Sequence, residues 1–497
     1  MSKSNTTEET MGQYMAKSFT QPTGGVLEDF QGVNIDQSVL ETYPEDTFFL
    51  KELSFNEDGF STTSSFKRVT SLNTEEIEFG LNEGGRGQIT PTKVDTFTGK
   101  FAGVGLDGFL TYEAQDSAKG FFNLLAMEVK QTLTRARILE ERTILSAFAT
   151  VELAAPVAPV ATTATAQTNG AIASGQALSV RCAALTFKGY NKVNPSIQGR
   201  LFKVKTLARL TSTKTYKTAD NVEHTVNGGA TEASLASNVV TTGAGNKNSV
   251  SASVDVVPGA AGYAWFIGPA GSERLVDVTY LNSVTINALP VNTLPLASTF
   301  DENRSTDEKV FDGIYAQIIK ANSGAKLVSL PTGNTGLTSD GVNSVKEIDD
   351  MLEYFKTNLN MIPDYMIMSA AVYNQMCNVV YKNGGQSLVT LPQNGDININ
   401  GGNTGIQLFN TKWGTKKVKV VVHPEAIEGS ILFWKKIIEQ SVGSSESARI
   451  SQRRKWYKQD WAQTNRTIQF GVYADEMLQI KAPFAFGLIQ NINVNAA

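Results

Sequence analysis

The sequence offers few side chains that could carry out catalysis or bind a transition metal. Its 497 residues include only two histidines, His224 and His423, and two cysteines, Cys182 and Cys377. A structural zinc site takes roughly four such ligands at close spacing, and a nucleophilic triad takes a histidine as its base. His423 stands beside Pro424 after an apolar run, which is typical of a structural residue at the end of a strand. The residue types therefore disfavour an enzyme, and we expect no catalytic, cofactor-binding or metal-binding residues.

Two short motifs resemble ligand-binding loops but lack the residues that those loops need. At Gly99-Lys100, a phosphate-binding loop would require glycine at position 94 and serine or threonine at position 101, where Val94 and Phe101 stand. The run Asp396–Gly401 copies the first half of a calcium loop, but the position of its bidentate glutamate is taken by Gln407. We therefore expect an Asn/Gly-rich surface loop at Asp396–Gly401, without a metal.

Charge is distributed unevenly along a chain whose formal net charge is only −4. Residues 1–60 hold eleven acidic residues against three lysines, whereas residues 410–460 hold eleven basic residues against five acidic ones. A free, sequence-reading nucleic-acid binder usually carries a net basic surface, so that class is disfavoured. The two segments are electrostatically complementary, either within one molecule or between neighbouring molecules.

A basic cluster within residues 449–461 admits three interpretations. The cations Arg453, Arg454, Lys455 and Lys458 are interleaved with the aromatic residues Trp456, Tyr457 and Trp461. Such a pattern suits the phosphates and stacked bases of a nucleic acid. It also suits an ion-paired surface beside partly buried aromatic side chains. We favour a third interpretation, in which the cluster pairs with the acidic N-terminal segment between subunits.

No stretch of the sequence resembles a targeting or membrane segment. The residues Met1–Thr10 are polar and acidic and include no apolar core of a signal peptide. The longest uncharged run, Leu153–Val180, is rich in Ala, Thr, Gly and Pro and is too polar to span a bilayer. We expect a soluble protein that is made in a cytoplasm and has no membrane partner.

A long amphipathic helix is predicted at residues 116–148. This stretch has no proline, and its apolar residues recur with a period near 3.6, as at Phe121, Leu125 and Val129. At ~1.5 Å per residue, such a helix would be about 50 Å long. Before it, Phe79–Gly108 contains eight glycines and is predicted to form a long two-stranded excursion that docks elsewhere.

A region rich in Ser, Thr, Val, Ala and Gly follows an Ala/Thr-rich linker at residues 150–175. Alternating apolar residues at 252–256 predict one strand, and further strands are predicted at Tyr263–Ile267, Val276–Tyr280 and Ser283–Leu289. Short strands at about ten-residue spacing predict a small β-sandwich over 176–298. Trp265 is the candidate aromatic residue of its core.

Mixed helices and strands are predicted after residue 299. Ser344 and Glu347 have capping-box spacing at the start of a helix whose apolar stripe runs from Val345 to Leu359. Ser369 is predicted to cap a second helix that ends at Val380. The predicted strands are Tyr365–Met368, Lys417–Val422 and Ile431–Trp434, and the apolar tail Met477–Val494 is predicted to be a buried strand pair.

This order of parts resembles the major capsid proteins of tailed double-stranded DNA bacteriophages, which have the Hong Kong 97-type fold. Met1–Glu45 would match that family's N-terminal arm, Phe79–Gly108 its extended hairpin and residues 116–148 its spine helix. The run Ile348–Val380 resembles the helix–strand–helix of its axial domain. The resemblance implies an α+β fold with an N-terminal arm, an extended hairpin loop, a long spine helix, and peripheral and axial domains. An inserted β-sandwich, which resembles a fibronectin-III or immunoglobulin-like strand pair, interrupts the family pattern directly after the helix.

The resemblance also implies domain boundaries. These are the N-terminal arm at 1–45, peripheral strands and the extended hairpin loop at 46–115 (loop at about 79–108), the spine helix at 116–148, the linker and Ig-like insertion at 149–298, a peripheral segment at 299–343, the axial domain at 344–475, and a returning peripheral strand at 476–497.

The function implied by the resemblance is structural: self-assembly into the icosahedral head shell of a virion that encloses the phage genome. The implied partners are many copies of the same chain in hexamers and pentamers, and scaffold, portal and head-decoration proteins. Packaged double-stranded DNA would be contacted weakly and without sequence specificity, and assembly would take place in the host bacterial cytoplasm. Two alternatives stay open. One is an encapsulin-like compartment, which shares the fold, and the other is an Ig-like surface adhesin, against which the missing signal peptide counts.

Overall fold

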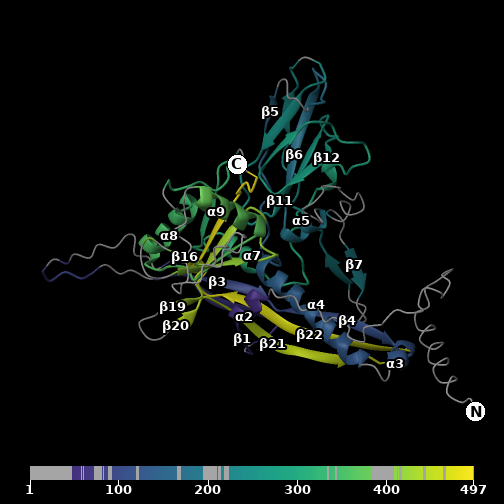
Figure 1. The fold of residues 1–497 in the computed structure, drawn as a ribbon, viewed down its shortest axis with the longest axis vertical. Helices are drawn as coiled ribbons and strands as arrows, with labels where there is room; N and C mark the ends of the chain where they lie inside the picture. Colours follow the sequence, from purple (N-terminus) through teal and green to yellow (C-terminus); the bar gives the residue numbers. More distant parts are fainter. Residues whose placement is uncertain are drawn as a thin grey trace, which may run out of the picture.

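The computed structural model is a mixed α+β protein with three parts, which confirms the predicted fold class (Figure 1). A long helix lies on a long sheet, a second sheet carries two helices beside them, and a lobe of small sheets stands above (Figure 1). The structure describes residues 47–57, 59, 61–71, 81, 83–87, 92–118, 123–164, 170–193, 210, 214–217, 223–243, 245–332, 335–341, 344–382, 408–410, 412, 417–439, 444–462 and 466–495. The predicted arm at 1–45 and the loop at Asp396–Gly401 lie outside the described residues.

The predicted long helix is present in a shorter form. β4 (Ala102–Thr111) leads directly into the short α3 (Tyr112–Ala118), and the long α4 runs from Leu124 to Ser146. Asn123 caps α4, because its side-chain oxygen accepts a hydrogen bond from the backbone N–H of Ala126 at 3.1 Å. The single helix predicted over 116–148 is therefore wrong at its N-terminal end, where Asn123 starts a new helix. The length of α4 is about 35 Å.

A four-stranded sheet, here called the long sheet, packs against α4 (Figure 1). Its order is β1 (Ser54–Asn56), β21 (Ala448–Asp460), β22 (Thr467–Ile480) and β4, with β1 parallel to β21 and the other pairs antiparallel. Gly108 of β4 lets the helix approach closely, because a Cβ there would lie 3.0 Å from Thr132 Oγ1 of α4 and 2.5 Å from the ring of Phe470. The close packing of α4 on β4 therefore depends on the absence of a side chain at Gly108.

The predicted two-stranded excursion is built from other strands than expected. β2 (Thr63–Ser71) pairs antiparallel with β3 (Lys93–Lys100), and β4 pairs with β22 instead of β3. The boundaries 79–108 are therefore wrong, since residues 102–108 belong to the long sheet. The reason is that β4 pairs with the distant strand β22 and not with β3, its neighbour in the sequence.

Arg68 fixes this β2–β3 ribbon to the body of the protein. Its fully buried guanidinium group donates hydrogen bonds to Asp95 Oδ2 at 2.7 Å and to the carbonyl oxygen of Gln317 at 3.2 Å. Gln317 belongs to α7 (Ile314–Ile319), which also packs against α4. The base of the ribbon is thus held by a paired charge as well as by backbone contacts.

The second part is a six-stranded sheet with helices α8 (Lys346–Leu359) and α9 (Ala370–Lys382) beside it (Figure 1). Its strand order is β14 (Lys326–Ser329), β23 (Phe486–Gln490), β18 (Ile431–Trp434), β15 (Tyr365–Met368), β17 (Lys417–Val422) and β16 (Leu408–Asn410). The predicted boundaries of β15, β17 and β18 are confirmed. The predicted helical stripe is also confirmed, because Ile348, Leu352 and Phe355 are buried under α8.

The start of α8 differs from the predicted capping box. The N-cap residue is Val345, without a side-chain hydrogen bond, and the Ser344 hydroxyl is buried with no hydrogen-bond partner in the described part of the chain. Glu347 instead accepts hydrogen bonds from the backbone N–H and the hydroxyl of Thr338, at 2.9 and 2.5 Å. A tertiary contact thus replaces the local one. The predicted cap of α9 is present, because Val372 N–H donates to Ser369 Oγ at 3.4 Å.

The C-terminal tail does not form the single returning strand expected at 476–497. Residues 476–480 complete β22 in the long sheet, and the short helix η4 (Pro483–Ala485) then leads the chain into β23 of the six-stranded sheet. The tail is buried as predicted, but its two strands lie in different sheets rather than pairing together. The predicted boundary at 475 is wrong for the same reason, because β21 and β22 belong to the long sheet and not to the six-stranded one.

The lobe above the two larger sheets contains most of the predicted β-rich segment. One sheet has the order β13 (Ser283–Ile286), β10 (Ser249–Ser253) and β5 (Val160–Ala164). The other has the order β12 (Arg274–Thr279), β11 (Gly262–Gly268), β6 (Ala177–Leu185) and β9 (Ser237–Val240). Trp265 is fully buried, as predicted, and its Nε1 donates to Thr279 Oγ1 at 2.8 Å.

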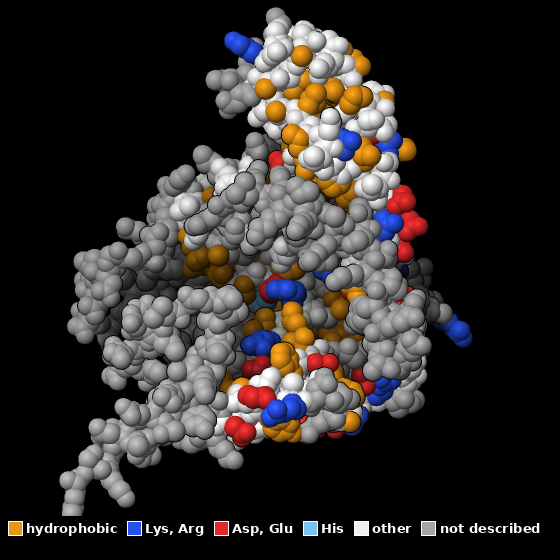
Figure 2. Space-filling view, turned by 90° about the vertical axis from the view of Figure 1, so that its right-hand side faces the viewer, with side chains coloured by type: hydrophobic (Ala, Val, Ile, Leu, Met, Phe, Trp, Pro, Cys, Tyr) orange, Lys and Arg blue, Asp and Glu red, His pale blue; other side chains and the backbone are white. Residues whose placement is uncertain are grey.

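The strand predicted at 252–256 ends at Ser253. Several smaller elements complete the described chain. They are α2 (Phe48–Glu52), α5 (Phe187–Val193), β7 (Lys214–Lys217), β8 (Glu223–Val226), η2 (Ala297–Thr299), β19 (Ile437–Glu439) and β20 (Ser444–Glu446). The surface of the lobe carries few charges and scattered apolar side chains (Figure 2).

The chain leaves α4 for the lobe and returns from it at adjacent positions. Asp312 joins the two passages, because its Oδ1 accepts hydrogen bonds from the backbone N–H groups of Ala149, Thr150 and Val151 at 2.8, 2.9 and 3.2 Å. The side chain of Asn303 donates to the carbonyl oxygen of Leu153 at 2.9 Å. Neighbouring ends are what an insertion into a continuous fold requires.

Candidate functional site

The two histidines and two cysteines lie in or next to separate elements of the fold. His423 follows β17 and is buried, with its Nε2 3.2 Å from Glu141 Oε1 of α4. The Glu141 carboxylate also accepts hydrogen bonds from the backbone N–H groups of Phe49 and Leu50 in α2, at 2.6 and 3.0 Å. His423 thus lies buried at the end of β17, and through Glu141 it helps to hold α2 on α4.

The two cysteines and His224 lie on three different elements of the fold. Cys182 lies buried in β6 and Cys377 lies buried in α9, both as free thiols, and burial raises the pKa of the Cys182 thiol. His224 belongs to β8. Among the described residues, no group of three or more His, Cys, Asp and Glu side chains is arranged to hold a metal ion. The described part of the chain also contains no helix that is both long and apolar enough to cross a membrane.

The basic cluster lies on β21, where carboxylates of the same chain pair with most of its cations. Arg453 pairs with Asp475 at 2.9 Å, Lys455 with Glu57 at 2.9 Å, and Lys458 with Asp460 at 2.6 Å. The guanidinium carbon of Arg454 lies 3.7 Å from the centre of the Tyr457 ring. This arrangement agrees with the ion-paired interpretation. The contact with Glu57 also shows that the acidic N-terminal and basic C-terminal segments meet within one chain.

Two buried carboxyl groups meet where α4 crosses the long sheet. Glu140 of α4 and Glu476 of β22 are 2% and 0% exposed. Trp456 Nε1 donates to Glu140 Oε2 at 3.1 Å, and Gln452 Nε2 donates to Glu476 Oε2 at 3.3 Å. Burial raises the pKa of both carboxyl groups, and the negative charge of Glu476 raises that of Glu140 further. Two like charges this close disfavour the ionisation of both carboxyl groups together.

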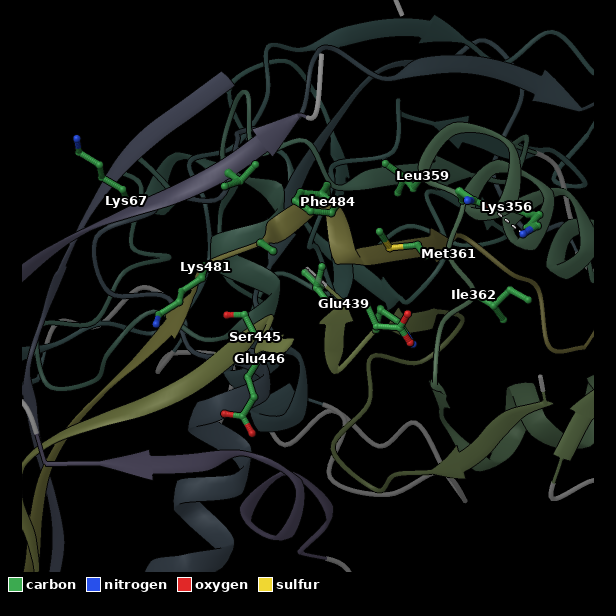
Figure 3. Close-up of a pocket in the computed structure, with 15 residues that line it drawn as sticks. Lys67, Lys356, Leu359, Met361, Ile362, Glu439, Ser445, Glu446, Lys481 and Phe484 are labelled. Carbon is green, nitrogen blue, oxygen red and sulfur yellow. Dashed lines mark hydrogen bonds between the residues drawn. The ribbon is translucent and has the colours of Figure 1, made fainter. Parts of the chain in front are cut away.

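An open cleft of about 890 Å³ lies between β2 of the β2–β3 ribbon, the turn after α8 and the β19–β20 hairpin (Figure 3). Lys67 and Lys481 lie on one side, and Lys356 and Ile362 at the end of α8 lie on the other (Figure 3). The ring of Phe484 forms part of the wall between them (Figure 3). The lining of the cleft mixes lysines, the carboxylates of Glu439 and Glu446, and apolar side chains, which suits the binding of a polypeptide segment.

A second hollow of about 500 Å³ adjoins this cleft. We call it the lysine groove, and its basic lining residues are Lys417, Lys419, Lys435 and Lys436. It shares Lys435 and Glu439 with the cleft. The surplus of basic residues in this segment is visible in the sequence, but only the fold brings β17, β18 and the following turn together.

No protein-family model matches the sequence, and no curated protein matches it. Several solved structures resemble the chain over most of its length. They include the cyanophage A-1(L) capsid asymmetric unit (8% identity, 92% of this chain and 96% of that chain, TM-score 0.41) and the capsid of Myoviridae phage XM1 (10% identity, 95% and 100%, TM-score 0.36). The holo-SrpI encapsulin complex from Synechococcus elongatus PCC 7942 also resembles it (7% identity, 95% and 97%, TM-score 0.36). Phage capsids and an encapsulin are thus among the solved structures that this chain resembles.

Proposed function

We propose that this protein is a structural subunit that assembles with copies of itself into the capsid shell of a tailed phage. The observation that carries the proposal is the long helix on its long sheet, with large apolar side chains left exposed along them. Phe109 of β4 is 69% exposed, Leu139 of α4 is 42% exposed, and Val94 of the β2–β3 ribbon is 50% exposed. Extended elements with exposed apolar side chains gain stability when neighbouring copies cover them.

In this proposal each part of the fold takes a role that the capsid resemblance implies. In this proposal α4, the long sheet and the β2–β3 ribbon form the peripheral domain with its extended loop. The six-stranded sheet with α8 and α9 forms the axial domain, and the lobe after α4 is the insertion. The ion pairing of the basic cluster favours protein contacts over tight DNA binding. The protein would catalyse no reaction and would be located in the virion. Scaffold, portal and decoration proteins would be its further partners.

Electron microscopy of the purified chain tests this function directly. Uniform hollow shells or tubes are the expected result. A protein that stays strictly monomeric under all assembly conditions would contradict the proposal. Deletion of residues 1–45 is expected to block assembly while the six-stranded sheet stays folded. Normal shells from the truncated chain would show that these residues are not an assembly arm.

A further inference from the structure

The lysine groove lies at the ends of the interior strands β18, β15 and β17 of the six-stranded sheet and has more lysines than the ion pairs of the described residues neutralise. Lys417 and Lys419 project from β17 and are exposed. Lys435 is held by Asp364 at 2.7 Å, and Lys436 by Glu52 at 2.9 Å. Within the described residues, neither Lys417 nor Lys419 forms an ion pair with a carboxylate. The groove therefore presents Lys417 and Lys419 without a carboxylate partner in the described chain, and its lining also includes Glu439.

Helix α2 brings the N-terminal end of the described chain to the edge of this groove. The ring of Phe48 packs edge-on against the ring of Tyr365, with 5.0 Å between centroids. Tyr365 lies next to Lys419 in the sheet, because these residues are register partners of β15 and β17. The carboxylate of Glu52 accepts hydrogen bonds from Tyr365 and Lys436 at 2.7 and 2.9 Å. Contacts with Tyr365 and Lys436 thus fix α2 beside the groove.

The electrostatics of α2 already depend on the groove. Burial alone would raise the pKa of the Glu52 carboxyl, but its pKa is lowered overall. The causes are the hydrogen bonds from Lys436 and Tyr365 together with the positive charges of Lys436 and Lys419. A carboxylate at this place is therefore stabilised, and further carboxylates nearby would be stabilised in the same way.

The sequence directly before α2 supplies such carboxylates. Residues 41–46 read Glu-Thr-Tyr-Pro-Glu-Asp and contain three acids and no base. An extended residue spans at most about 3.6 Å, so Asp46 lies within about 7 Å of Phe48 and Glu45 within about 11 Å. Lysine side chains add several ångströms of reach. Exposed Ile437, which also lines the groove, offers an apolar contact for Tyr43.

We propose that the acidic segment Glu41–Asp46 binds in the lysine groove of its own chain, with its carboxylates beside Lys417 and Lys419. This contact fixes the direction in which residues 1–40 leave the body of the protein. The inference concerns the single subunit and does not depend on shell formation.

Limited proteolysis of the unassembled full-length chain tests this contact. A protease that cuts after glutamate would cleave after Glu41 and Glu45 slowly in the native chain, because the groove covers these sites. The variant K417E/K419E is expected to be cut roughly three- to tenfold faster, as befits the loss of two partly exposed ion pairs. Adding E45K/D46K to it is expected to restore slow cleavage after Glu41. The matched control K247E/K346E reverses two exposed lysines elsewhere and is expected to change nothing.

Carbodiimide cross-linking identifies the occupant, because this reagent joins a carboxylate to an amine in contact. With a mixture of isotopically light and heavy native chains, we expect links from Lys417 or Lys419 to Glu45 or Asp46 within one isotope only. Light–heavy links would place a neighbour's segment in the groove and overturn the proposal. Unchanged proteolysis in both K417E/K419E and the neutral K417Q/K419Q, each with native circular dichroism, would also overturn it.

Discussion

Replacing Glu140 by glutamine is expected to stabilise the protein at neutral and alkaline pH. Glu140 and Glu476 lie buried together between α4 and the long sheet, where Glu140 accepts a hydrogen bond from Trp456 Nε1 and Glu476 accepts one from Gln452 Nε2. The amide in E140Q keeps an oxygen that accepts from Trp456 and gains an N–H that donates to Glu476. The variant thus supplies permanently what the shared proton supplies in the native chain.

The pH dependence of the free energy of unfolding follows from the raised pKa of Glu140. Burial and the charge of Glu476 raise the pKa of Glu140 from 4.5 to about 9. Below pH 4.5 the group is protonated in both the folded and the unfolded chain, and its contribution to stability is fully present. Between these two values only the unfolded chain releases the proton, so the free energy of unfolding falls by about 1.4 kcal/mol per pH unit. From pH 5 to pH 7 this amounts to about 3 kcal/mol, all of which E140Q is expected to retain.

Urea denaturation of the unassembled subunit at pH 5, 6, 7 and 8, followed by circular dichroism, measures this difference. The native chain is expected to lose stability with rising pH, and E140Q is expected to follow a flatter curve that lies above it at pH 7 and 8. The control E128Q changes a partly exposed pair with Arg135 on the same helix and should alter stability by less than about 0.5 kcal/mol, without changing the slope of stability against pH. If E140Q is less stable than the native chain at pH 8, or keeps its slope, the two carboxyl groups do not share a proton.

Three further changes test the Asp312 contact between the two chain segments that lead into and out of the lobe, the exposed apolar faces, and the lobe itself. D312A removes the acceptor of three backbone N–H groups and should lower the free energy of unfolding by about 1–3 kcal/mol in urea denaturation, whereas D255A at an exposed site should not. F109D should abolish assembly in analytical ultracentrifugation while circular dichroism stays native; shells from F109D would argue against β4 as a contact face. Replacing residues 154–302 by a short Gly/Ser linker should leave a soluble chain, because Leu153 and Asn303 are already hydrogen-bonded; an insoluble product would make the lobe an integral part of the core.

Local patterns predict the parts of the fold in which each element depends on its own residues. The apolar stripe of α8 is visible in the sequence because helical periodicity puts Ile348, Leu352 and Phe355 on one side. The boundaries of β15, β17 and β18 agree with the predicted ones, because each strand is a short run with high strand propensity and clear polar or turn residues beside it. The scarcity of His and Cys disfavours a catalytic site on composition alone.

Local sequence patterns cannot predict how distant segments of the chain pair with one another. β4 pairs with β22 across more than 350 residues, so sequence proximity wrongly suggests a partner near β3. Ser344 and Glu347 have ideal capping spacing, but Thr338 offers Glu347 a better hydrogen bond in the folded chain. The composition of the C-terminal tail predicts one apolar strand pair. In the structure η4 divides the tail between two sheets, which its composition does not indicate.

The sequence by itself determined the α+β class, the order of the parts, the buried lobe core around Trp265 and the opposite charges of the two ends of the chain. Only the tertiary structure decided which of those charges meet, as in the pairs Glu57–Lys455 and Glu52–Lys436. It also placed Glu140 against Glu476, and Asp312 between the two passages of the lobe. The physical reason is that propensity and periodicity act over a few residues, whereas burial, hydrogen bonding and charge pairing depend on distances that exist only after folding.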